Sequence, residues 1–296
     1  MSAISYSTTP FLINELKYVT KNVPHSINFL HLSCATLTHA SSEMRVYQHF
    51  DEIMQTAEKL QQKAKNNHIL MVYDIDNTLL TGAHPLATSE WFDWQAGLIK
   101  ENNGSKYRVA NNILSLVDIQ VDIFNWAGLQ PVEPNNIKSV MHLKNLGYPS
   151  IVLTARSDDM FPATLREFAR NGLWFADDDQ LIKNQRFYIN NNQAAAPIVL
   201  QGSIIMASGQ NKGLALQQLL SSAKYESKYI IFVDDVEKNV KDMAKIFEKD
   251  PHYHVIAVHY TYSEPNVIKF KAMDKLSIHT DYLEFANLKG KLQPKM

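Results

Sequence analysis

Short apolar runs that end abruptly in polar residues recur along this chain of 296 residues. Their length and composition are typical of buried parallel strands. They cover residues 71–73, 151–154, 229–233 and 254–260. Apolar positions at helical spacing lie between the runs and predict helices at residues 50–65, 136–146 and 214–220. This alternation predicts an α/β fold built on a doubly wound parallel sheet.

Two carboxylates directly follow the first apolar run. Asp74 and Asp76 stand two residues apart, and the hydroxyl of Thr78 follows. Open α/β sheets bind ligands outside the carboxyl ends of their strands. Two acids crowded there repel each other unless a cation or a proton lies between them. The pattern therefore predicts a divalent metal and one carboxylate that can act as a nucleophile; an ordinary acidic turn is the alternative.

Three further fragments suit phosphate chemistry. Thr154 ends the second run, where its hydroxyl either bonds a phosphate oxygen or caps the next helix. Lys212 precedes a helical run, a position unfavourable against the helix dipole that a nearby anion would explain. Asp234 and Asp235 end the third run, with Asn239 four residues further on. Mg²⁺ takes oxygen ligands of this kind.

Together these fragments resemble the motifs of the haloacid dehalogenase (HAD) superfamily of phosphohydrolases. The resemblance is carried by Asp74-Ile75-Asp76-Asn77-Thr78, Thr154, Lys212 and Asp234-Asp235 with Asn239. It implies a Rossmann-like HAD fold and Mg²⁺-dependent hydrolysis of phosphomonoesters through an aspartyl-phosphate. Asn239 departs from the pattern, because many members carry a second acid at that place. A phosphotransferase of the same fold and a non-catalytic binding or regulatory protein stay open as alternatives.

The resemblance also implies a role for each matching residue. Asp74 would be the nucleophile and Asp76 the general acid and base. Phosphate binding would fall to Thr154, Lys212 and Asn77. The metal set would be drawn from Asp74, Asp76, Asp235 and Asp234, supported by Thr78 and Asn239. Within the acidic pair, Asp235 is the expected ligand. Dehalogenases of the superfamily lack the second acid, so Asp76 argues against that activity.

The stretch between the first two motifs is longer than one crossover helix needs. Residues 81–132 have a helical pattern, with one helix opening at Ser89 and another at Val109–Phe124. In the family, an insert here is a small helical cap over the active site. The expected division is an N-terminal extension (1–43), a core (44–80 and 133–296) and this cap.

Several residues of these segments are candidates for contact with substrate. Trp91, Phe92 and Trp94 would either shape a pocket in the cap or anchor the cap. His84, which precedes a proline, would touch substrate or cap a loop. Arg156 would contact a phosphate or pair with Asp158.

A narrower resemblance comes from Asp74–Leu80 followed closely by Glu90–Gln95. These stretches look like a bacterial, Legionella-type subgroup of HAD proteins that includes effector phosphotyrosine phosphatases. This resemblance implies a phosphotyrosine protein as substrate and secretion into a host cell. The sequence does not separate a phosphotyrosine protein from a small or aryl phosphate as the substrate, and the cytoplasm is the expected location, with the secreted effector as the alternative.

The composition of the chain limits the other classes of protein to which it could belong. The net charge is −1, and no basic stripe with interleaved aromatics predicts nucleic-acid binding. Cys34 is the only cysteine, which excludes an intrachain disulfide.

No apolar run is long enough to span a membrane. Residues 27–40 resemble a weak signal-peptide region, and contact of the extension with a partner or a membrane surface stays open. An extra strand at 44–47 and a last helix at 281–288 complete the predicted elements.

Overall fold

The computed structural model describes residues 42–64, 69–102, 104–175, 182–192 and 195–292. These residues fall within the compact unit 39–296. The predicted N-terminal extension and its signal-like run lie outside the described residues, except that Ser42 and Glu43 open the first strand.

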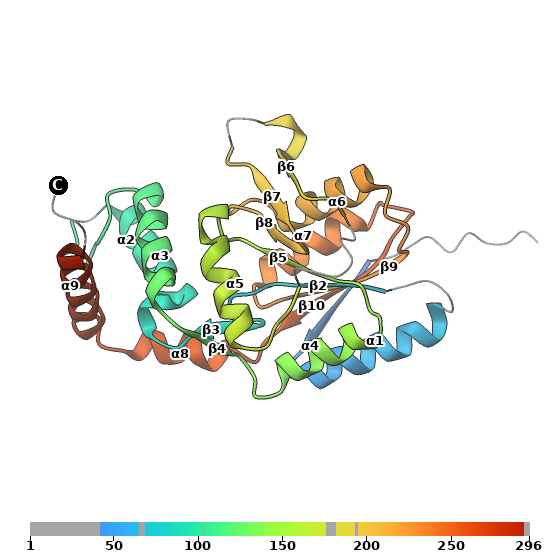
Figure 1. Cartoon of the computed structure of the whole chain (residues 1–296), viewed down its shortest axis with the longest axis horizontal. Coiled ribbons are helices and arrows are strands. Elements are labelled where there is room, and N and C mark those ends of the chain that lie inside the picture. Colours follow the sequence, from blue (N-terminus) through green and yellow to red (C-terminus); the bar gives the residue numbers. More distant parts are fainter. Residues whose placement is uncertain (1–41, 65–68, 103, 176–181, 193–194, 293–296) are drawn as a thin grey trace, which may run out of the picture. The chain divides into compact units, whose positions relative to one another are not determined.

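An eight-stranded sheet forms the centre of this unit (Figure 1). Its strand order is β1-β10-β9-β2-β5-β8-β7-β6. The strands are β1 (Ser42–Tyr47), β2 (Ile69–Tyr73), β5 (Ser150–Thr154), β6 (Gln185–Phe187), β7 (Ile198–Gln201), β8 (Ile204–Met206), β9 (Tyr229–Asp234) and β10 (His254–Tyr260). In this spatial order, each strand from β1 across to β8 is parallel to its neighbours in that part of the sheet. This arrangement confirms the predicted fold class. The sheet also has an antiparallel edge, β7 and β6, that was not predicted.

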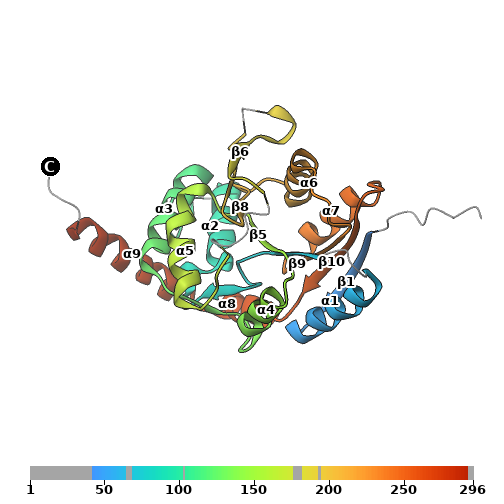
Figure 2. The ribbon, with the colours of Figure 1, turned by 45° about the vertical axis from the view of Figure 1, so that its right-hand side comes forward.

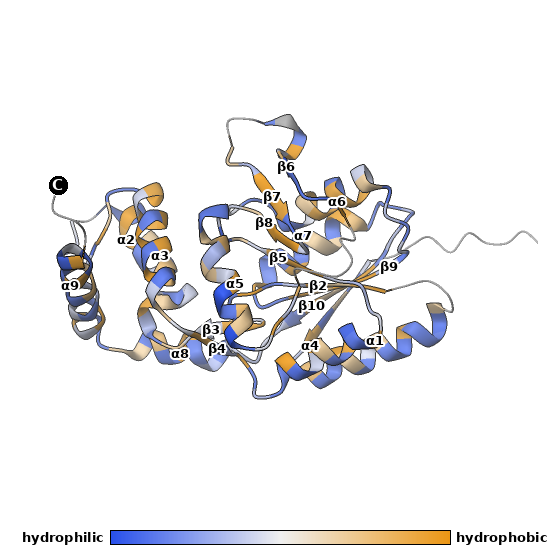
Figure 3. Ribbon diagram, in the orientation of Figure 1, coloured by the Kyte–Doolittle hydropathy of each residue, from blue (hydrophilic) through white to orange (hydrophobic). Residues whose placement is uncertain are grey.

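Helices cover both faces of the sheet because its strands are apolar on both faces. Leu70 and Val72 of β2 face one core, whereas Met71 and Tyr73 face the other. The first core is closed by α6 (Lys212–Ala223) and α7 (Glu237–Phe247), and the second by α1 (Phe50–Ala64), α4 (Asn136–Asn145) and α5 (Phe161–Arg170). In Figure 3 the strands are accordingly among the most apolar elements. The predicted helices at 50–65 and 136–146 are confirmed.

The insert follows β2 and is closed by a two-stranded antiparallel ladder. Its elements are β3 (Leu80–Gly82), the 3₁₀ helix η1 (Pro85–Ala87), α2 (Ser89–Glu101), α3 (Ile113–Trp126) and β4 (Leu129–Pro131). Helix α3 lies beside α5 (Figure 2). It begins at Ile113 rather than at the predicted Val109. Asn112 caps it by accepting a bond from the N–H of Ser115, and the N–H of Val109 instead donates to the side chain of Gln95.

The described residues end in two helices where the sequence predicted one. These are α8 (Glu264–Ala272) and α9 (Lys275–Leu292), so the predicted helix at 281–288 lies within α9. Both pack on the insert, since α8 contacts α2 and the ring of Tyr282 in α9 lies 6.0 Å from that of Trp91. None of the described helices combines the length and the apolar character of a membrane span.

Candidate active site

Strand register brings the two acidic motifs together. Tyr73 of β2 pairs with Val233 of β9, and the N–H of Asp74 donates to the carbonyl of Val233 over 2.9 Å. Asp74 therefore lies beside Asp234 at the carboxyl edge of the sheet. Strand β5 pairs with the other side of β2 and ends at Thr154 on the same edge. The sheet thus carries three of the four predicted motifs to one place.

Lys212 joins the acidic residues of the two strands. Its Nζ lies 2.7 Å from Oδ1 of Asp74 and 2.7 Å from Oδ2 of Asp234, and all three side chains are buried. The lysine is the first residue of α6. It can reach inward because Gly213 lets α6 begin close to α7: a Cβ there would lie 2.7 Å from Cδ1 of Ile246.

The two acids of the fourth motif have different surroundings. Both oxygens of Asp234 are engaged, Oδ1 by the N–H of Val236 at 2.9 Å and Oδ2 by Lys212, while Nδ2 of Asn239 donates to both at 3.1 and 3.2 Å. Among the described residues, none makes a hydrogen bond to the Asp235 carboxylate; the backbone N–H of Asp235 donates to Oγ1 of Thr78 over 3.1 Å. Asp234 therefore orients Lys212, and Asp235 has the carboxylate better placed to bind a metal.

The carboxylates of this site suit a hard cation. Asp74, Asp234 and Asp235 each offer an oxygen within 4.8 Å of the other two. Burial, with Asp234 and Asp76 nearby, raises the pKa of Asp74 to about 7, although Lys212 acts in the opposite direction. Burial, followed by Asp234 and Asp74, raises the pKa of Asp235 well above its ordinary value. Such a crowded acidic site favours a bound cation or a proton, and its all-oxygen donors fit Mg²⁺.

The raised pKa values predict that metal binding strengthens with pH. A cation and a proton compete for the same carboxylates, so binding must release any proton held by Asp74 or Asp235. Loss of the Asp74 proton alone should raise the affinity for Mg²⁺ about tenfold per pH unit below roughly pH 7, and any proton held by Asp235 adds to this dependence. Isothermal titration with MgCl₂ across this range measures the change. An affinity that does not depend on pH, or an unchanged affinity in Asp235→Asn, would contradict the assignment.

Asp76 lies on the turn after β2 and is paired with Arg156. The guanidinium makes a two-pronged contact, Nε to Oδ2 at 2.9 Å and Nη2 to Oδ1 at 2.7 Å. The suggested pairing of Arg156 with Asp158 is therefore wrong, because Asp158 pairs instead with Arg186 at 2.6 Å. The reason is register: β5 lies next to β2, so the residues that follow the two strands meet.

The hydroxyl residues of the motifs are both buried. Oγ1 of Thr154 accepts a bond from the N–H of Arg156 over 3.2 Å, which leaves its proton to donate. Thr78 binds the N–H of Asp235 and so ties the first motif to the fourth. This contact fits the supporting role expected for Thr78, as the contact of Asn239 with Asp234 fits the role expected for Asn239.

Asn77 forms the turn rather than facing the acidic cluster. Its φ is +59°, a left-handed conformation that asparagine adopts more readily than most residues. Nδ2 donates to Oε1 of Glu90 at 2.9 Å, Oδ1 accepts from Thr81, and the N–H donates to the carbonyl of Leu80. Since its side chain and N–H are both engaged within the protein, the expected phosphate contact of Asn77 would require these bonds to be exchanged.

The family of the chain follows from a sequence model. A family model described as "Protein of unknown function (DUF2608)" matches residues 46–292. The chain belongs to the DUF2608 family. The comparison with curated proteins gives no match.

Several solved structures are similar to this DUF2608 chain at low identity. A class C acid phosphatase from Bacillus anthracis is 13% identical over 83% of this chain and 88% of its own, with a TM-score of 0.39. The HAD domain of the Legionella pneumophila effector Lem4 is 11% identical over 77% and 100%, with a TM-score of 0.34. A phospho-aspartyl intermediate analogue of phosphoserine phosphatase is 15% identical over 69% and 99%, with a TM-score of 0.32. Likenesses of this degree carry no argument about function.

The candidate substrate residues of the insert contact the C-terminal helices. Trp91 is fully buried against Tyr282, and the ring of Trp94 lies 6.4 Å from that of Phe270 in α8. His84 caps η1 through the N–H of Leu86, and its Nε2 lies 3.6 Å from Asp281 of α9. Phe92 is half-buried against the same core. These contacts give the four residues a packing role, and their contact with substrate stays a prediction.

Four residues that support the site were not singled out from the sequence of this DUF2608 chain. Glu90 holds Asn77, Asn136 donates to the carbonyls of Thr78 and Leu79, His259 contacts the carbonyl of Asp235, and Phe124 stacks on Arg156. Glu90 and Asn136 stand at helix starts, where their residue types are common for local reasons. Only the fold shows that their side chains reach the first motif.

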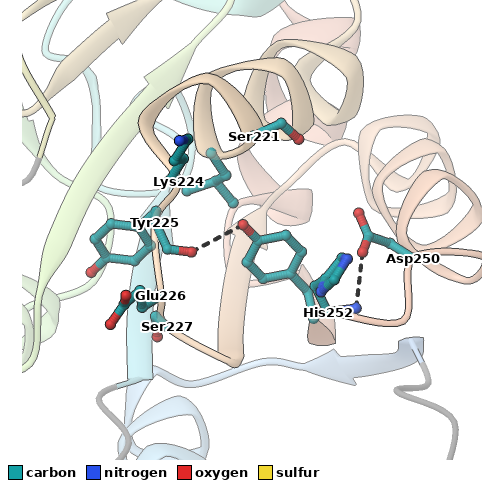
Figure 4. A pocket seen from close by; sticks show the side chains of 9 residues that line it. Ser221, Lys224, Tyr225, Glu226, Ser227, Asp250 and His252 are labelled. Atoms are coloured by element: carbon teal, nitrogen blue, oxygen red, sulfur yellow. Dashed lines mark hydrogen bonds between the residues drawn. The ribbon is translucent and has the colours of Figure 1, made fainter.

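One pocket lies at the opposite, amino edge of the sheet (Figure 4). Its lining comes from the end of α6 and from the segments before β9 and β10. Two bonds shape it: the hydroxyl of Tyr253 donates to the carbonyl of Tyr225 over 3.2 Å, and the N–H of His252 donates to Asp250 over 3.0 Å. It shares no residue with the acidic cluster, and it is not the candidate active site.

Proposed function

We propose that this chain is a HAD-type, Mg²⁺-dependent phosphomonoester hydrolase that works through an aspartyl-phosphate on Asp74. The observation that carries the proposal is the buried bridge of Lys212 between Asp74 and Asp234, with an oxygen of Asp235 within 4.8 Å of an oxygen of each acid. Lys212 favours the ionised, nucleophilic form of Asp74, and the neighbouring acids favour a bound cation. This arrangement suits attack on a dianionic phosphate.

The first half-reaction transfers the phosphoryl group to the protein. An oxygen of Asp74 attacks phosphorus while the bond from phosphorus to the leaving oxygen breaks, and Asp76 gives its proton to that oxygen. In the second half-reaction, Asp76 takes a proton from a water that attacks phosphorus, and the bond to Asp74 breaks to release inorganic phosphate. Positioned acid and base help of this kind is typically worth about 10²–10⁴-fold.

The remaining residues bind the group in transfer. Burial acts to lower the pKa of Lys212, but Asp234 and Asp74 together outweigh burial and raise that pKa above its ordinary value, so Lys212 is charged. It can therefore stabilise negative charge on the phosphoryl oxygens, to which Thr154 can also donate. Asp74, Asp235 and the backbone of Asp76 would hold Mg²⁺, with Asp234 behind them. The ion, when bound, would offset the charge repulsion between the carboxylate and the phosphate.

The substrate that we propose is a small or aryl phosphate or a phosphotyrosine protein. The cytoplasm is the proposed place of action, with secretion as an effector into a host cell as the alternative. These assignments rest on the motif resemblance, together with the acidic site that a phosphomonoester and Mg²⁺ would fill.

Phosphate release tests the proposal. We expect the protein to release phosphate from para-nitrophenyl phosphate or from a phosphotyrosine peptide in Mg²⁺, and to lose this activity in excess EDTA, because the acidic cluster would then repel the substrate. The ratio of the two rates separates a small-molecule enzyme from a protein phosphatase. Equal rates in Mg²⁺ and EDTA would contradict the metal requirement, and release from neither substrate would contradict the proposed substrate class.

A further inference from the structure

The contact between Arg156 and Asp76 occupies the expected acid and base of the reaction. Each carboxylate oxygen of Asp76 accepts one bond from the guanidinium, at 2.9 and 2.7 Å. The Arg156 side chain is 3% exposed, whereas that of Asp76 is 24% exposed. A carboxylate has about four lone-pair sites, so this two-pronged contact leaves others for the leaving group or water. The arginine therefore orients Asp76 without covering it.

Arg156 is itself held on two further sides. Nη1 donates to Oγ1 of Thr164 over 2.9 Å, and that hydroxyl donates to the carbonyl of Met160. The guanidinium carbon lies 4.4 Å from the centre of the Phe124 ring, a cation–π distance. A buried guanidinium with this many contacts has one orientation, and it imposes that orientation on the carboxylate of Asp76.

Phe124 belongs to the insert, so its contact with Arg156 depends on where the insert lies. Phe124 lies near the end of α3, and α5 of the core holds that end in place. Nη2 of Arg166 donates to the carbonyls of Phe124 and Ala127, and the carboxylate of Glu167 accepts the N–H of Leu129 over 2.7 Å. The place of the Phe124 ring over Arg156 is thus set by how the insert docks on α5.

We infer that Arg156 is a positioning residue that holds Asp76 in the orientation for proton transfer to the leaving oxygen, and that Phe124 couples this orientation to the docked insert. The inference rests on the proposed phosphomonoesterase function. This positioning role replaces the expected contact of Arg156 with a phosphate, since the fork of the guanidinium is already directed at the carboxylate of Asp76. Lysine cannot substitute, because an ammonium lacks the planar fork.

Leaving-group dependence separates this role from substrate binding. Phenyl phosphate needs a proton on its leaving oxygen, whereas para-nitrophenolate leaves readily without one. We expect Arg156→Lys to lower kcat/KM on phenyl phosphate by about 10–100-fold, part of what acid help is worth, and to change kcat/KM on para-nitrophenyl phosphate only a few-fold. The comparison uses kcat/KM because kcat also includes the second half-reaction, in which Asp76 acts as the base for both substrates. Phe124→Leu should shift the ratio of the two rates in the same direction by a smaller factor.

Two controls make the result specific. Arg186→Lys changes a half-exposed arginine paired with neighbouring Asp158 and should leave the ratio unchanged. In an Asp76→Asn background, Arg156→Lys should cause no further loss on phenyl phosphate, because residues that act as one unit are not additive. A further loss in that background would overturn the inference.

The positioning role of Arg156 and the proposed phosphomonoesterase function can fail separately. Wild-type activity on both substrates with equal losses of kcat/KM in Arg156→Lys would overturn the positioning role alone. A raised KM with an unchanged kcat would do the same and return Arg156 to substrate binding. No metal-dependent activity of the wild type on either substrate would overturn the proposed function, and the positioning role with it. An unchanged ratio in Phe124→Leu would remove the coupling to the insert.

Discussion

Asp74→Asn is expected to lower phosphate release from para-nitrophenyl phosphate by on the order of 10⁴-fold or more. The substitution removes the attacking oxygen's charge while it keeps nearly the same shape. The fold should survive, because the pKa of Asp74 is raised to about 7 and a neutral group at this buried place removes repulsion from Asp234 and Asp76. Steady-state rates, with circular dichroism to check the fold, measure the effect.

The control for Asp74→Asn is a variant that loses one carboxylate outside the acidic cluster. Asp159 is exposed in the segment after Thr154, so Asp159→Asn removes the same charge outside the cluster. It should retain the wild-type rate within about twofold, since an exposed charge near the surface acts weakly through water. Asp74→Asn with the activity of this control would remove Asp74 as the nucleophile.

Lys212→Met is expected to affect both catalysis and stability. Loss of its charge should lower kcat by about 10²–10³-fold, the usual effect of removing one preorganised donor to a developing oxyanion. The variant also leaves the buried carboxylates of Asp74 and Asp234 without their shared cation. Breaking a buried ion pair from one side typically costs about 3–5 kcal/mol of unfolding free energy. Urea unfolding of the metal-free proteins measures this loss.

Lys245→Met serves as the matched control for Lys212→Met. Lys245 is exposed on α7, and its replacement should change the unfolding free energy by no more than about 0.5 kcal/mol. If Lys212→Met unfolds at the same urea concentration as this control, the bridge between the two strands does not exist in solution.

The acidic cluster was predictable because its parts end parallel strands. Each apolar run before Asp74, Thr154 and Asp234 is continuous, and a parallel α/β sheet places all such ends on one edge. Lys212 could be predicted as part of the cluster because it stands at the start of a helix that follows a further strand. Local sequence and sheet topology agree at these positions, so the motif residues lie together in the structure.

The partners of Asp76 and of the insert could not be predicted in the same way. Arg156 has an acid two residues away, at Asp158, and nothing local shows that the register of β5 directs it to Asp76 instead. The apolar face of α2 is similar to that of any core helix, so Trp91 and Trp94 gave no indication that α8 and α9 cover them. These contacts depend on how distant segments pack, which periodicity does not encode.

The domain division of the chain stays a prediction. The ladder of β3 and β4 encloses residues 83–128, close to the insert expected at 81–132. The C-terminal helices were assigned to the core, but the aromatic side chains of α9 contact the insert. Movement of the insert would therefore involve α8 and α9, together with the Phe124 ring over Arg156.

The most direct test of the central claim is to detect the phosphate on Asp74. The protein is mixed with para-nitrophenyl phosphate in Mg²⁺, quenched in acid during the first turnovers, digested and analysed by mass spectrometry. The account predicts one phosphate on the peptide that contains Asp74, at Asp74 itself, and none in EDTA or in Asp74→Asn. Phosphate on another residue, or turnover by Asp74→Asn with no modified peptide, would contradict it.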